Sequence, residues 1–241
     1  MNILVVSDNV ELTGFFRDLA LQGFFHDVSF EYRYASLNKT NEAFEAQGIH
    51  AINLKDNQII DHIIEKFSLV FSLHCKQVFP EKLVREVKCI NIHPGYNPYN
   101  RGWYPQVFSL INQLPLGATI HLMDEKIDHG KILFQEKVML TLSDTSLTAY
   151  RKVIEVEKTL LKQHLAEIIN NTCHSTTPSN EGNYNGIADF KELCQLDLNS
   201  KATLSEHLNL LRALTHGDFK NGWFINEEGK KVYVTLTLKE E

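Results

Sequence analysis

The sequence predicts an α/β fold, in which a doubly wound and mostly parallel sheet precedes a small C-terminal helix and β-hairpin. Short apolar runs rich in β-branched residues alternate with amphipathic segments over roughly the first ninety residues, which is typical of parallel strands joined by helices. Near the C-terminus, a stretch with helical spacing is followed by two stretches that flank Glu228 and Gly229, as in a hairpin.

In the N-terminal part we expect strands and helices to alternate. The strands are predicted at 2–8, 28–36, 50–54, 68–73 and 88–93, and the helices at 10–25, 40–47, 56–67 and 80–87. The helix at 56–67 has its isoleucines and Phe67 on one face and Asp56 at the N-cap position. Gly14 and Gly23 weaken the helix at 10–25.

The second half of the chain is less regular. It predicts helices at 103–114, 143–170 and 203–216, strands at 117–124 and 131–140, and the hairpin at 222–238. We expect a main domain at 1–171 and a C-terminal part at 172–241. Residues 172–198 are rich in Ser, Thr, Asn and Gly, which favours either a linker or an ordered functional loop.

Composition and charge exclude several classes of protein. The 241 residues are 43% hydrophobic and 22% charged, which is ordinary for a globular protein. The formal net charge is −6 and no run of Lys or Arg occurs, so a nucleic-acid partner is disfavoured. No apolar stretch approaches the length of a membrane span, and the N-terminus lacks the pattern of a signal peptide.

The cysteines point to a reducing compartment. Cys75, Cys89, Cys173 and Cys194 lie far apart in the sequence and form no CxxC pair. Zinc ribbons and disulfide frameworks need closer or more numerous cysteines. We therefore expect a cytoplasmic, metal-free protein.

The stretch NIHPGYNPYNRGW, residues 91–103, ends an apolar strand with two polar side chains and then continues as an irregular loop. In an open α/β sheet, ligands bind beyond the carboxyl ends of the strands. The i, i+2 spacing of Asn91 and His93 places both on one face of the strand. An amide can donate to a developing oxyanion, and an imidazole can exchange a proton near neutral pH. Alternatively, Asn91 caps a turn and His93 is an ordinary loop residue.

A second candidate is Asp128, which precedes a tight turn at His129 and Gly130 between two predicted strands. Asp and Gly are common in turns for conformational reasons alone. A carboxylate at this place is also suited to orient His93 and raise its basicity.

Taken together, these two motifs resemble the formyltransferase family that uses N10-formyltetrahydrofolate. The family carries an N-x-H-P strand end and, further on, an aspartate followed by x-G-x-I. Here they occur as Asn91-Ile92-His93-Pro94 and Asp128-His129-Gly130-Lys131-Ile132. The resemblance covers roughly residues 67–135, and it extends towards the C-terminus through LLRALTHGDFKNGWF.

The resemblance implies a Rossmann-like catalytic domain and a role for each residue. Asn91 would stabilise the oxyanion of the tetrahedral intermediate, His93 would act as general acid/base, and Asp128 would position His93 or relay a proton. N10-formyltetrahydrofolate would be the co-substrate. No metal and no nucleophilic Ser or Cys would be needed, because the acyl donor arrives activated.

The resemblance also implies two folate-binding segments. The first includes Lys76, Gln77, Val78 and Phe79, and the second includes Asp124, Glu125 and Lys126. For Val78 and Phe79, simple core packing is an equal alternative.

The segment after the catalytic histidine lines the acceptor side in this family. The expected substrate-binding residues there are Tyr96, Asn97, Arg101, Gly102, Trp103 and Tyr104. Arg101 would meet a pyrophosphate, and Trp103 or Tyr104 a sugar or base. Near the C-terminus, Phe219, Lys220 and Trp223, with His216 and Asn221 beside them, resemble a nucleotide contact. Alternatively, these aromatic rings simply pack against the domain or a second subunit.

The resemblance is greatest to sugar-nucleotide N-formyltransferases. The chain lacks a long basic C-terminal domain and has only a poor glycine loop after its first strand, which disfavours tRNA and glycinamide ribonucleotide acceptors. The expected reaction formylates the 4-amino group of dTDP-4-amino-4,6-dideoxyglucose for lipopolysaccharide O-antigen biosynthesis. We expect the enzyme to be a homodimer. Open alternatives are a 3-amino-3,6-dideoxy sugar, a GDP-linked 4-amino sugar, or a non-catalytic nucleotide-binding module.

Overall fold

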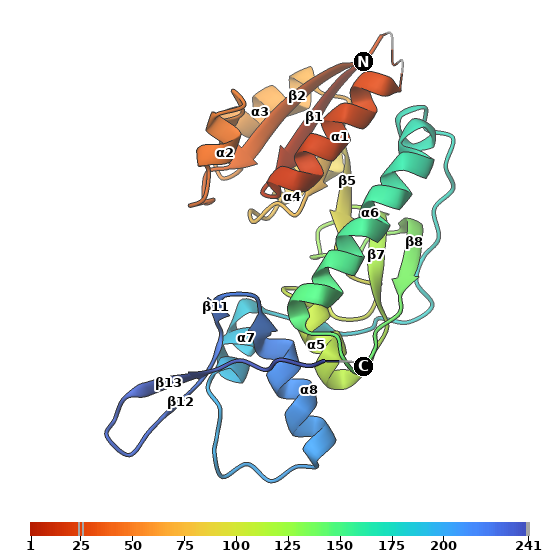
Figure 1. Cartoon of the computed structure of the whole chain (residues 1–241). Helices are drawn as coiled ribbons and strands as arrows, with labels where there is room; N and C mark the ends of the chain where they lie inside the picture. The colour runs from red at the N-terminus through yellow and green to blue at the C-terminus, as the bar shows by residue number, and fades with distance from the viewer. Residues whose placement is uncertain (24, 26, 240–241) are drawn as a thin grey trace. The chain divides into compact units, whose positions relative to one another are not determined.

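The structure, a computed structural model, describes residues 1–23, 25 and 27–239 (Figure 1). The chain divides into two compact units. The first unit comprises Met1–His93, Thr119–Gln135 and Glu157–Ser179, and the second unit comprises Pro94–Ala118, Glu136–Val156 and Asn180–Glu241. The division into domains at 171 and 172 remains a prediction.

A seven-stranded sheet forms the frame of the first unit, in the order β3-β2-β1-β4-β5-β7-β8. Its strands are β1 (Asn2–Ser7), β2 (Ser29–Ala35), β3 (His50–Ile52), β4 (Leu69–Leu73), β5 (Lys88–His93), β7 (Leu116–Leu122) and β8 (Ile132–Val138). The strands from β3 to β5 are parallel, whereas β7 runs antiparallel to β5. The predicted α/β class with a doubly wound, mostly parallel sheet is therefore confirmed.

Helices cover both faces of this sheet. On one face, α3 (Asn57–Lys66) and α4 (Glu81–Glu86) close a core cluster with Leu4 of β1 and Val70 of β4. On the other face lies α1 (Val10–Gln22), whose Phe16 ring meets that of Phe71 edge-on at 5.1 Å. The C-terminal half of α6 (Ser146–Ile169) lies beside α1, where Lys158 pairs with Glu11 at 2.6 Å.

Two N-terminal helices differ from their predicted lengths. α1 ends at Gln22, and Gly23 caps it by donating its N–H to the Leu19 carbonyl. Phe24, within the predicted helix, lies outside the described residues. The predicted helix at 40–47 is reduced to α2 (Glu42–Glu45), whose Phe44 is buried.

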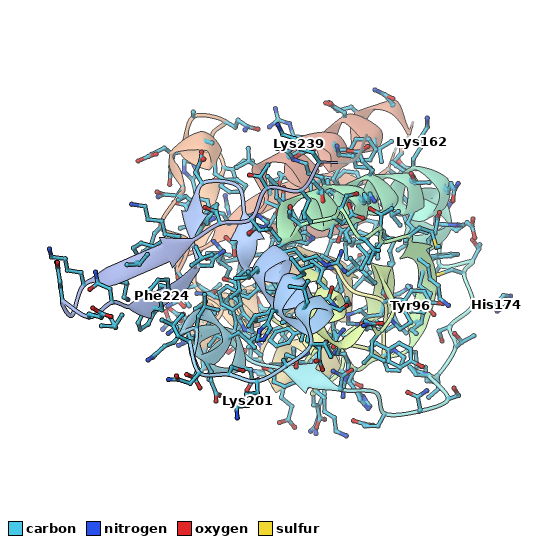
Figure 2. All side chains as sticks on the ribbon, turned by 60° about the horizontal axis from the view of Figure 1, so that its bottom comes forward. Tyr96, Lys162, His174, Lys201, Phe224 and Lys239 are labelled. Atoms are coloured by element: carbon cyan, nitrogen blue, oxygen red, sulfur yellow. The ribbon has the colours of Figure 1, made fainter. Side chains whose placement is uncertain are left out.

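The second unit is built from short elements. They are β6 (Arg101–Gly102), α5 (Pro105–Asn112), β9 (Tyr184–Asn185), α7 (Ile187–Cys194), α8 (Leu204–Leu214), β10 (Thr215–His216), β11 (Phe219–Lys220), β12 (Gly222–Ile225) and β13 (Lys231–Val234). The predicted hairpin is confirmed, since β12 and β13 are antiparallel with Trp223 opposite Tyr233. Phe224 projects from this hairpin, and Lys201 lies in the exposed connection before α8 (Figure 2).

Residues 172–198 form regular local structure rather than an extended linker, and a function for this loop remains a prediction. Thr176 bridges to Ile132, and β9 and α7 follow it. β9 pairs in parallel with β6, so this segment completes the irregular loop that follows β5. Across the described residues, no helix combines the length and the apolar character that a membrane crossing requires.

Candidate active site

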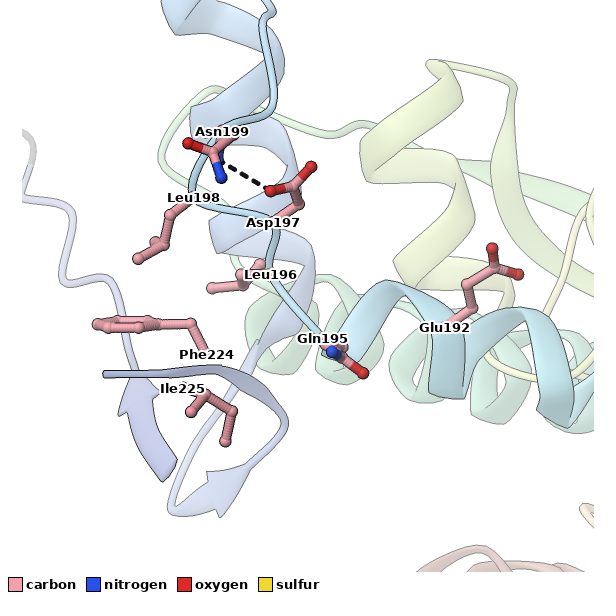
Figure 3. Close-up of a pocket in the computed structure, with 8 residues that line it drawn as sticks. All are labelled: Glu192, Gln195, Leu196, Asp197, Leu198, Asn199, Phe224 and Ile225. Carbon is pink, nitrogen blue, oxygen red and sulfur yellow. Dashed lines mark hydrogen bonds between the residues drawn. The ribbon is translucent and has the colours of Figure 1, made fainter. Parts of the chain in front are cut away.

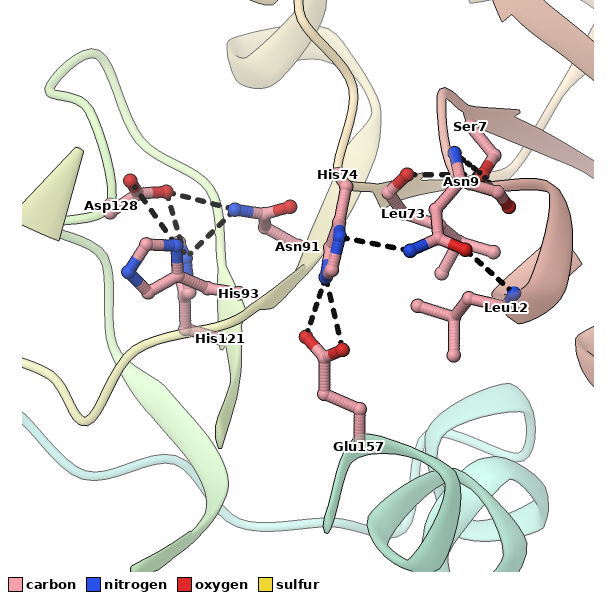
Figure 4. A network of polar contacts seen from close by, with 10 residues as sticks. All are labelled: Ser7, Asn9, Leu12, Leu73, His74, Asn91, His93, His121, Asp128 and Glu157. Atoms are coloured by element: carbon pink, nitrogen blue, oxygen red, sulfur yellow. Dashed lines mark hydrogen bonds and ion pairs between the residues drawn. The ribbon is translucent and has the colours of Figure 1, made fainter. Parts of the chain in front are cut away.

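Asn91 and His93 lie at the carboxyl end of β5, and both reach the same partner. Asn91 Nδ2 donates a hydrogen bond to Asp128 Oδ1 at 2.8 Å, and His93 Nδ1 lies 3.4 Å from Asp128 Oδ2 (Figure 4). The His93 and Asp128 side chains are only 4% and 11% exposed. The shared face that the i, i+2 spacing predicts is thus confirmed, and it belongs to a largely buried site.

The backbone around Asp128 is shaped by close approach to β7. Asp128 itself has a φ of 50°, in the left-handed region. A Cβ atom on Gly130 would lie 1.8 Å from the Leu122 carbonyl oxygen, so only glycine fits there. Leu122 in turn donates its N–H to the Lys131 carbonyl at 2.9 Å. Gly130 therefore allows the turn to pack closely against β7, and the Asp128 carboxylate lies within hydrogen-bond distance of β5.

His121 is a member of this site that the sequence analysis did not identify. It lies on β7 directly opposite Asn91 and is 1% exposed. Its Nδ1 donates to the Leu122 carbonyl at 2.8 Å, so the neutral ring keeps its lone pair on Nε2. Asn91 Nδ2 lies 3.4 Å from that Nε2, and Asp128 Oδ1 lies 3.6 Å from it. A histidine within the mostly apolar strand LGATIHL was the available sequence signal, but only the pairing of β7 with β5 shows that it faces Asn91.

The first predicted folate segment follows β4 in the first unit. Phe79 is 4% exposed and belongs to the core cluster, so core packing accounts for its side chain. Val78 is 67% exposed, and core packing does not account for it. The buried Gln77 amide accepts from the Leu54 N–H and donates to Ser36, and Asp8 accepts from the Lys76 N–H at 2.6 Å. Burial raises the pKa of Asp8 despite that hydrogen bond.

The second predicted folate segment follows β7. Met123, just before it, packs against the same core cluster as Cys75, which precedes the first segment. Within it, Asp124 Oδ1 accepts from the Lys126 N–H at 2.9 Å, and Glu125 Oε1 accepts from Arg85 Nε at 2.6 Å. The second segment, like the first, is therefore held by its own hydrogen bonds.

In the second unit, the predicted acceptor loop is held by a set of amides. Asn100 is fully buried at a φ of 50°. Its amide group is bonded to Ser109, Asn112, Asn183 and Asn185. Arg101, next to it, is 7% exposed and lies 3.2 Å from Glu181. Its predicted pyrophosphate contact remains a prediction.

The aromatic residues of the acceptor loop differ in their packing. The Tyr104 ring packs on Phe190 of α7 with centroids 4.3 Å apart, and the Trp103 ring lies 5.7 Å from that of Tyr104. Tyr96 lies under Lys137 in a cation–π contact, and Asn97 is buried. Gly102 has a φ of 93°, which suits glycine. The Tyr104 ring is therefore packed within the second unit.

The residues near the C-terminus that are predicted to contact the nucleotide also differ in their packing. Phe219 is 68% exposed, with its ring edge-on to His216 at 5.7 Å. Trp223 lies under Lys231, whose Nζ is 3.6 Å from the ring centroid, and its carbonyl accepts from the Leu196 N–H. Burial and nearby Arg151 lower the pKa of His216. Phe219 thus offers the open aromatic face, whereas Trp223 is partly covered.

A pocket of about 470 Å³ lies in the second unit, next to the hairpin (Figure 3). It is lined by Glu192, Gln195, Leu196, Asp197, Leu198, Asn199, Phe224 and Ile225. None of the predicted site residues lines it. Among the residues described, no group of three or more His, Cys, Asp or Glu side chains is arranged to hold a metal ion.

Comparison with known proteins places this site in a family. The formyl transferase family model matches residues 26–165, and the model of the N-formyltransferase dimerization C-terminal domain matches residues 189–240. A dTDP-4-amino-4,6-dideoxyglucose formyltransferase of Mycobacterium tuberculosis (strain ATCC 25618 / H37Rv) is 44% identical over 76% of this chain and 78% of that protein.

Two solved structures are similar over the whole chain. A sugar N-formyltransferase from Shewanella sp FDAARGOS_354 is 48% identical with a TM-score of 0.98, covering 100% of this chain and 99% of that one. A 4-N formyltransferase from Francisella tularensis is 45% identical with a TM-score of 0.94, covering 100% and 98%. With the Asn91, His93 and Asp128 constellation, these matches lead to one conclusion: the chain belongs to the formyl transferase family and is a sugar N-formyltransferase.

Proposed function

We propose that this protein transfers a formyl group from N10-formyltetrahydrofolate to the 4-amino group of dTDP-4-amino-4,6-dideoxyglucose. The observation that carries the proposal is the convergence of Asn91, His93 and His121 on Asp128 at the carboxyl end of β5. The names of the Mycobacterium and Francisella relatives support the sugar and the position of its amine. The product would serve the biosynthesis of a surface polysaccharide such as an O-antigen.

Asn91 is suited to stabilise the formyl oxygen as it gains negative charge. One N–H of its amide is held by Asp128 at 2.8 Å, which fixes the orientation of the group. The contact with His121 is longer, at 3.4 Å, so the second N–H can be redirected to the substrate at little cost. Such a donor in a buried site is worth about 10²–10³ in rate.

His93 is suited to move the proton. In the reaction a bond forms between the amine nitrogen and the formyl carbon, and the bond from that carbon to N10 breaks. His93 would take the proton that the amine loses and return one to the leaving nitrogen. Asp128, 3.4 Å from His93 Nδ1, would hold the ring and stabilise its protonated form.

The folate co-substrate would supply a formyl carbon already activated for attack by an amine. Each of the two predicted folate segments carries or adjoins an exposed apolar side chain. Val78 in the first segment is 67% exposed, and Ile127, after the second, is 41% exposed. Two exposed apolar side chains beside fixed backbone suit a flat aromatic ring system. Lys76, Gln77, Val78 and Phe79 would bind it together with Asp124, Glu125 and Lys126.

The second unit would bind the sugar nucleotide. Phe219, with its exposed ring beside His216, is the best candidate to stack on the base. Lys220 and Trp223 would lie near it. Tyr96, Asn97, Arg101, Gly102, Trp103 and Tyr104 would line the path to the sugar.

We also propose that the enzyme works as a homodimer in the cytoplasm. The match of residues 189–240 to a dimerization domain supports the dimer. Cys75, Cys89, Cys173 and Cys194 are free thiols, which fits a reducing compartment. Light scattering at working concentration tests the dimer, and a monomeric mass would overturn it.

The reaction is tested by a turnover assay with N10-formyltetrahydrofolate and a panel of amino sugar nucleotides, following the release of tetrahydrofolate. Formylation of dTDP-4-amino-4,6-dideoxyglucose in preference to the others is the expected result. Preference for a 3-amino-3,6-dideoxy sugar or a GDP-linked 4-amino sugar would keep the reaction and replace the acceptor. Absence of turnover on the whole panel would overturn the proposal.

A further inference from the structure

The carboxyl ends of β1 and β4 are joined by a compact set of hydrogen bonds. These two strands are neighbours at the point where the strand order reverses, with β2 on one side and β5 on the other. Ser7 Oγ donates to the Leu73 carbonyl at 3.0 Å, and the Asp8 N–H donates to the same carbonyl at 3.2 Å. The end of β4 is therefore fixed to β1 up to Leu73.

The next residue, His74, leaves the strand in an unusual conformation. Its φ is 56°, in the left-handed region that disfavours a side chain such as histidine. Such a backbone persists only where its surroundings hold it. The residues that contact the His74 ring therefore bear on the path of the chain after β4.

Glu157 of α6 holds the His74 ring. His74 Nε2 lies 2.8 Å and 3.0 Å from the two carboxylate oxygens of Glu157. The Glu157 side chain is completely buried, and that of His74 is 12% exposed. Burial raises the pKa of Glu157, while its pairing with His74 opposes that rise. Figure 4 shows this pair, with the His74 ring between Glu157 and Asn9.

Asn9 fixes which nitrogen of His74 carries the proton. Asn9 caps α1, and its Oδ1 accepts from the Leu12 N–H at 2.9 Å, which sets the orientation of the amide. Its Nδ2 is thereby turned towards His74 Nδ1, at 3.4 Å. Nδ1 then accepts, and the proton of the neutral ring lies on Nε2, facing Glu157. The helix cap, the imidazole and the carboxylate thus form one directed chain of hydrogen bonds.

The segment that follows His74 is the first predicted folate segment. Its later part is fixed by Asp8 at Lys76, by the buried Gln77 amide and by Phe79 in the core. Its first turn depends on the backbone of His74.

We propose that Glu157 and His74 are positioning residues for the folate segment at 76–79. Glu157 holds the His74 ring, the ring holds the left-handed backbone, and that backbone sets where the peptide groups beside Val78 meet the co-substrate. This inference rests on the proposed function, because it presumes that the segment binds folate.

The experiment measures tetrahydrofolate binding by calorimetry and, separately, the KM of each substrate and kcat. Glu157→Gln and His74→Ala should each weaken tetrahydrofolate binding by about tenfold or more, because the first removes the buried charge that holds the His74 ring and the second removes the ring. The KM for the amino sugar nucleotide should change by no more than about twofold. The double variant should bind no more weakly than the weaker single variant, since the two residues act as one unit.

His74→Asn separates the effect of the backbone conformation from the effect of the imidazole ring. Asparagine tolerates the left-handed region better than alanine, so His74→Asn should bind tetrahydrofolate more tightly than His74→Ala. Glu167→Gln is the matched control, because Glu167 pairs with His164 on the same helix at 3.1 Å but at the exposed surface. This control should bind and turn over as the wild type does. All five variants are compared by thermal unfolding, and His74→Asn keeps the inference testable if Glu157→Gln fails to fold.

The outcomes separate this inference from the proposed function. Wild-type protein that binds no tetrahydrofolate overturns both. Wild-type binding with unchanged affinity in Glu157→Gln and His74→Ala overturns the inference alone. Equal weakening in His74→Asn and His74→Ala, or a rise confined to the KM of the sugar nucleotide, also overturns it, because the pair would then act by direct contact.

Discussion

Asn91 and Asp128, 37 residues apart in the sequence, are joined by a 2.8 Å hydrogen bond from the amide Nδ2 to a carboxylate oxygen. This bond fixes the orientation of the Asn91 amide, and the same carboxylate lies 3.4 Å from the His93 ring. One side chain therefore contacts both the proposed donor to the formyl oxygen and the group proposed to move the proton.

Replacing this carboxylate should affect chemistry far more than folding. Asp128→Asn cannot accept from Asn91 and stabilise a protonated His93 at the same time, so we expect kcat to fall by about 10²–10⁴. The melting temperature and sugar-nucleotide binding should stay near wild type. Asp61→Asn, which breaks the exposed Lys82 pair, is the control. Comparable turnover in Asp128→Asn and the control would contradict the assigned role.

His121 should affect turnover through its contact with the Asn91 amide. His121→Phe keeps a ring in β7 but removes the Nε2 lone pair that faces the Asn91 amide. The resting amide then loses the weaker of its two contacts, and kcat should fall by up to about tenfold with little change in either KM. His121→Gln, which keeps an acceptor, should recover part of the loss. Steady-state kinetics of the two variants decide this, and equal losses would show that Nε2 is not the relevant atom.

Replacing Gly130 or Gly14 by alanine should change the free energy of unfolding in opposite directions. A Cβ at Gly130 meets the Leu122 carbonyl at 1.8 Å, so Gly130→Ala should destabilise the protein by about 1–3 kcal/mol and displace Asp128. Gly14, inside α1, has nothing within 4 Å of its added Cβ. Gly14→Ala should therefore stabilise the protein by about 0.5–1 kcal/mol. Urea unfolding and kcat of both variants test the pair, and a fully active Gly130→Ala would refute the close-approach argument.

Asp144 should make stability depend on pH in the acid range. Burial tends to raise its pKa, but the Lys152 hydrogen bond and the Thr141 N–H together bring the pKa below the usual 3.8. The folded state thus favours the ionised form of Asp144 more strongly than the unfolded state does. The resulting stabilisation is complete well above pH 3.8 and is lost as the pH falls below 3.8 through the lowered pKa.

The measurement is the free energy of unfolding from pH 7 to pH 3 for wild type and Asp144→Asn. The variant should be less stable by about 1 kcal/mol at pH 7. The difference should shrink as the pH approaches and passes below 3.8. A difference that stays constant down to pH 3 would show that the carboxylate charge contributes nothing.

Much of the fold is local and was predictable. The strand at 88–93, the helix that became α3 with Asp56 as its cap, and the C-terminal hairpin follow from spacing, capping and turn residues. The placement of Asn91 and His93 on one face follows from the period of two along a strand. The family motif that includes Asp128 was also readable, because its residues are fixed in sequence.

The sequence by itself determined the alternation of elements and the residues at the end of β5. Only the tertiary structure decided which strands pair. The antiparallel pairing of β5 with β7 brings His121 to Asn91 across 30 residues, and α6 brings Glu157 to His74 across 83. It also decided that Phe79 is core and Val78 exposed. The physical reason is that periodicity and capping act within a few residues, whereas buried polar contacts depend on the packing of distant elements.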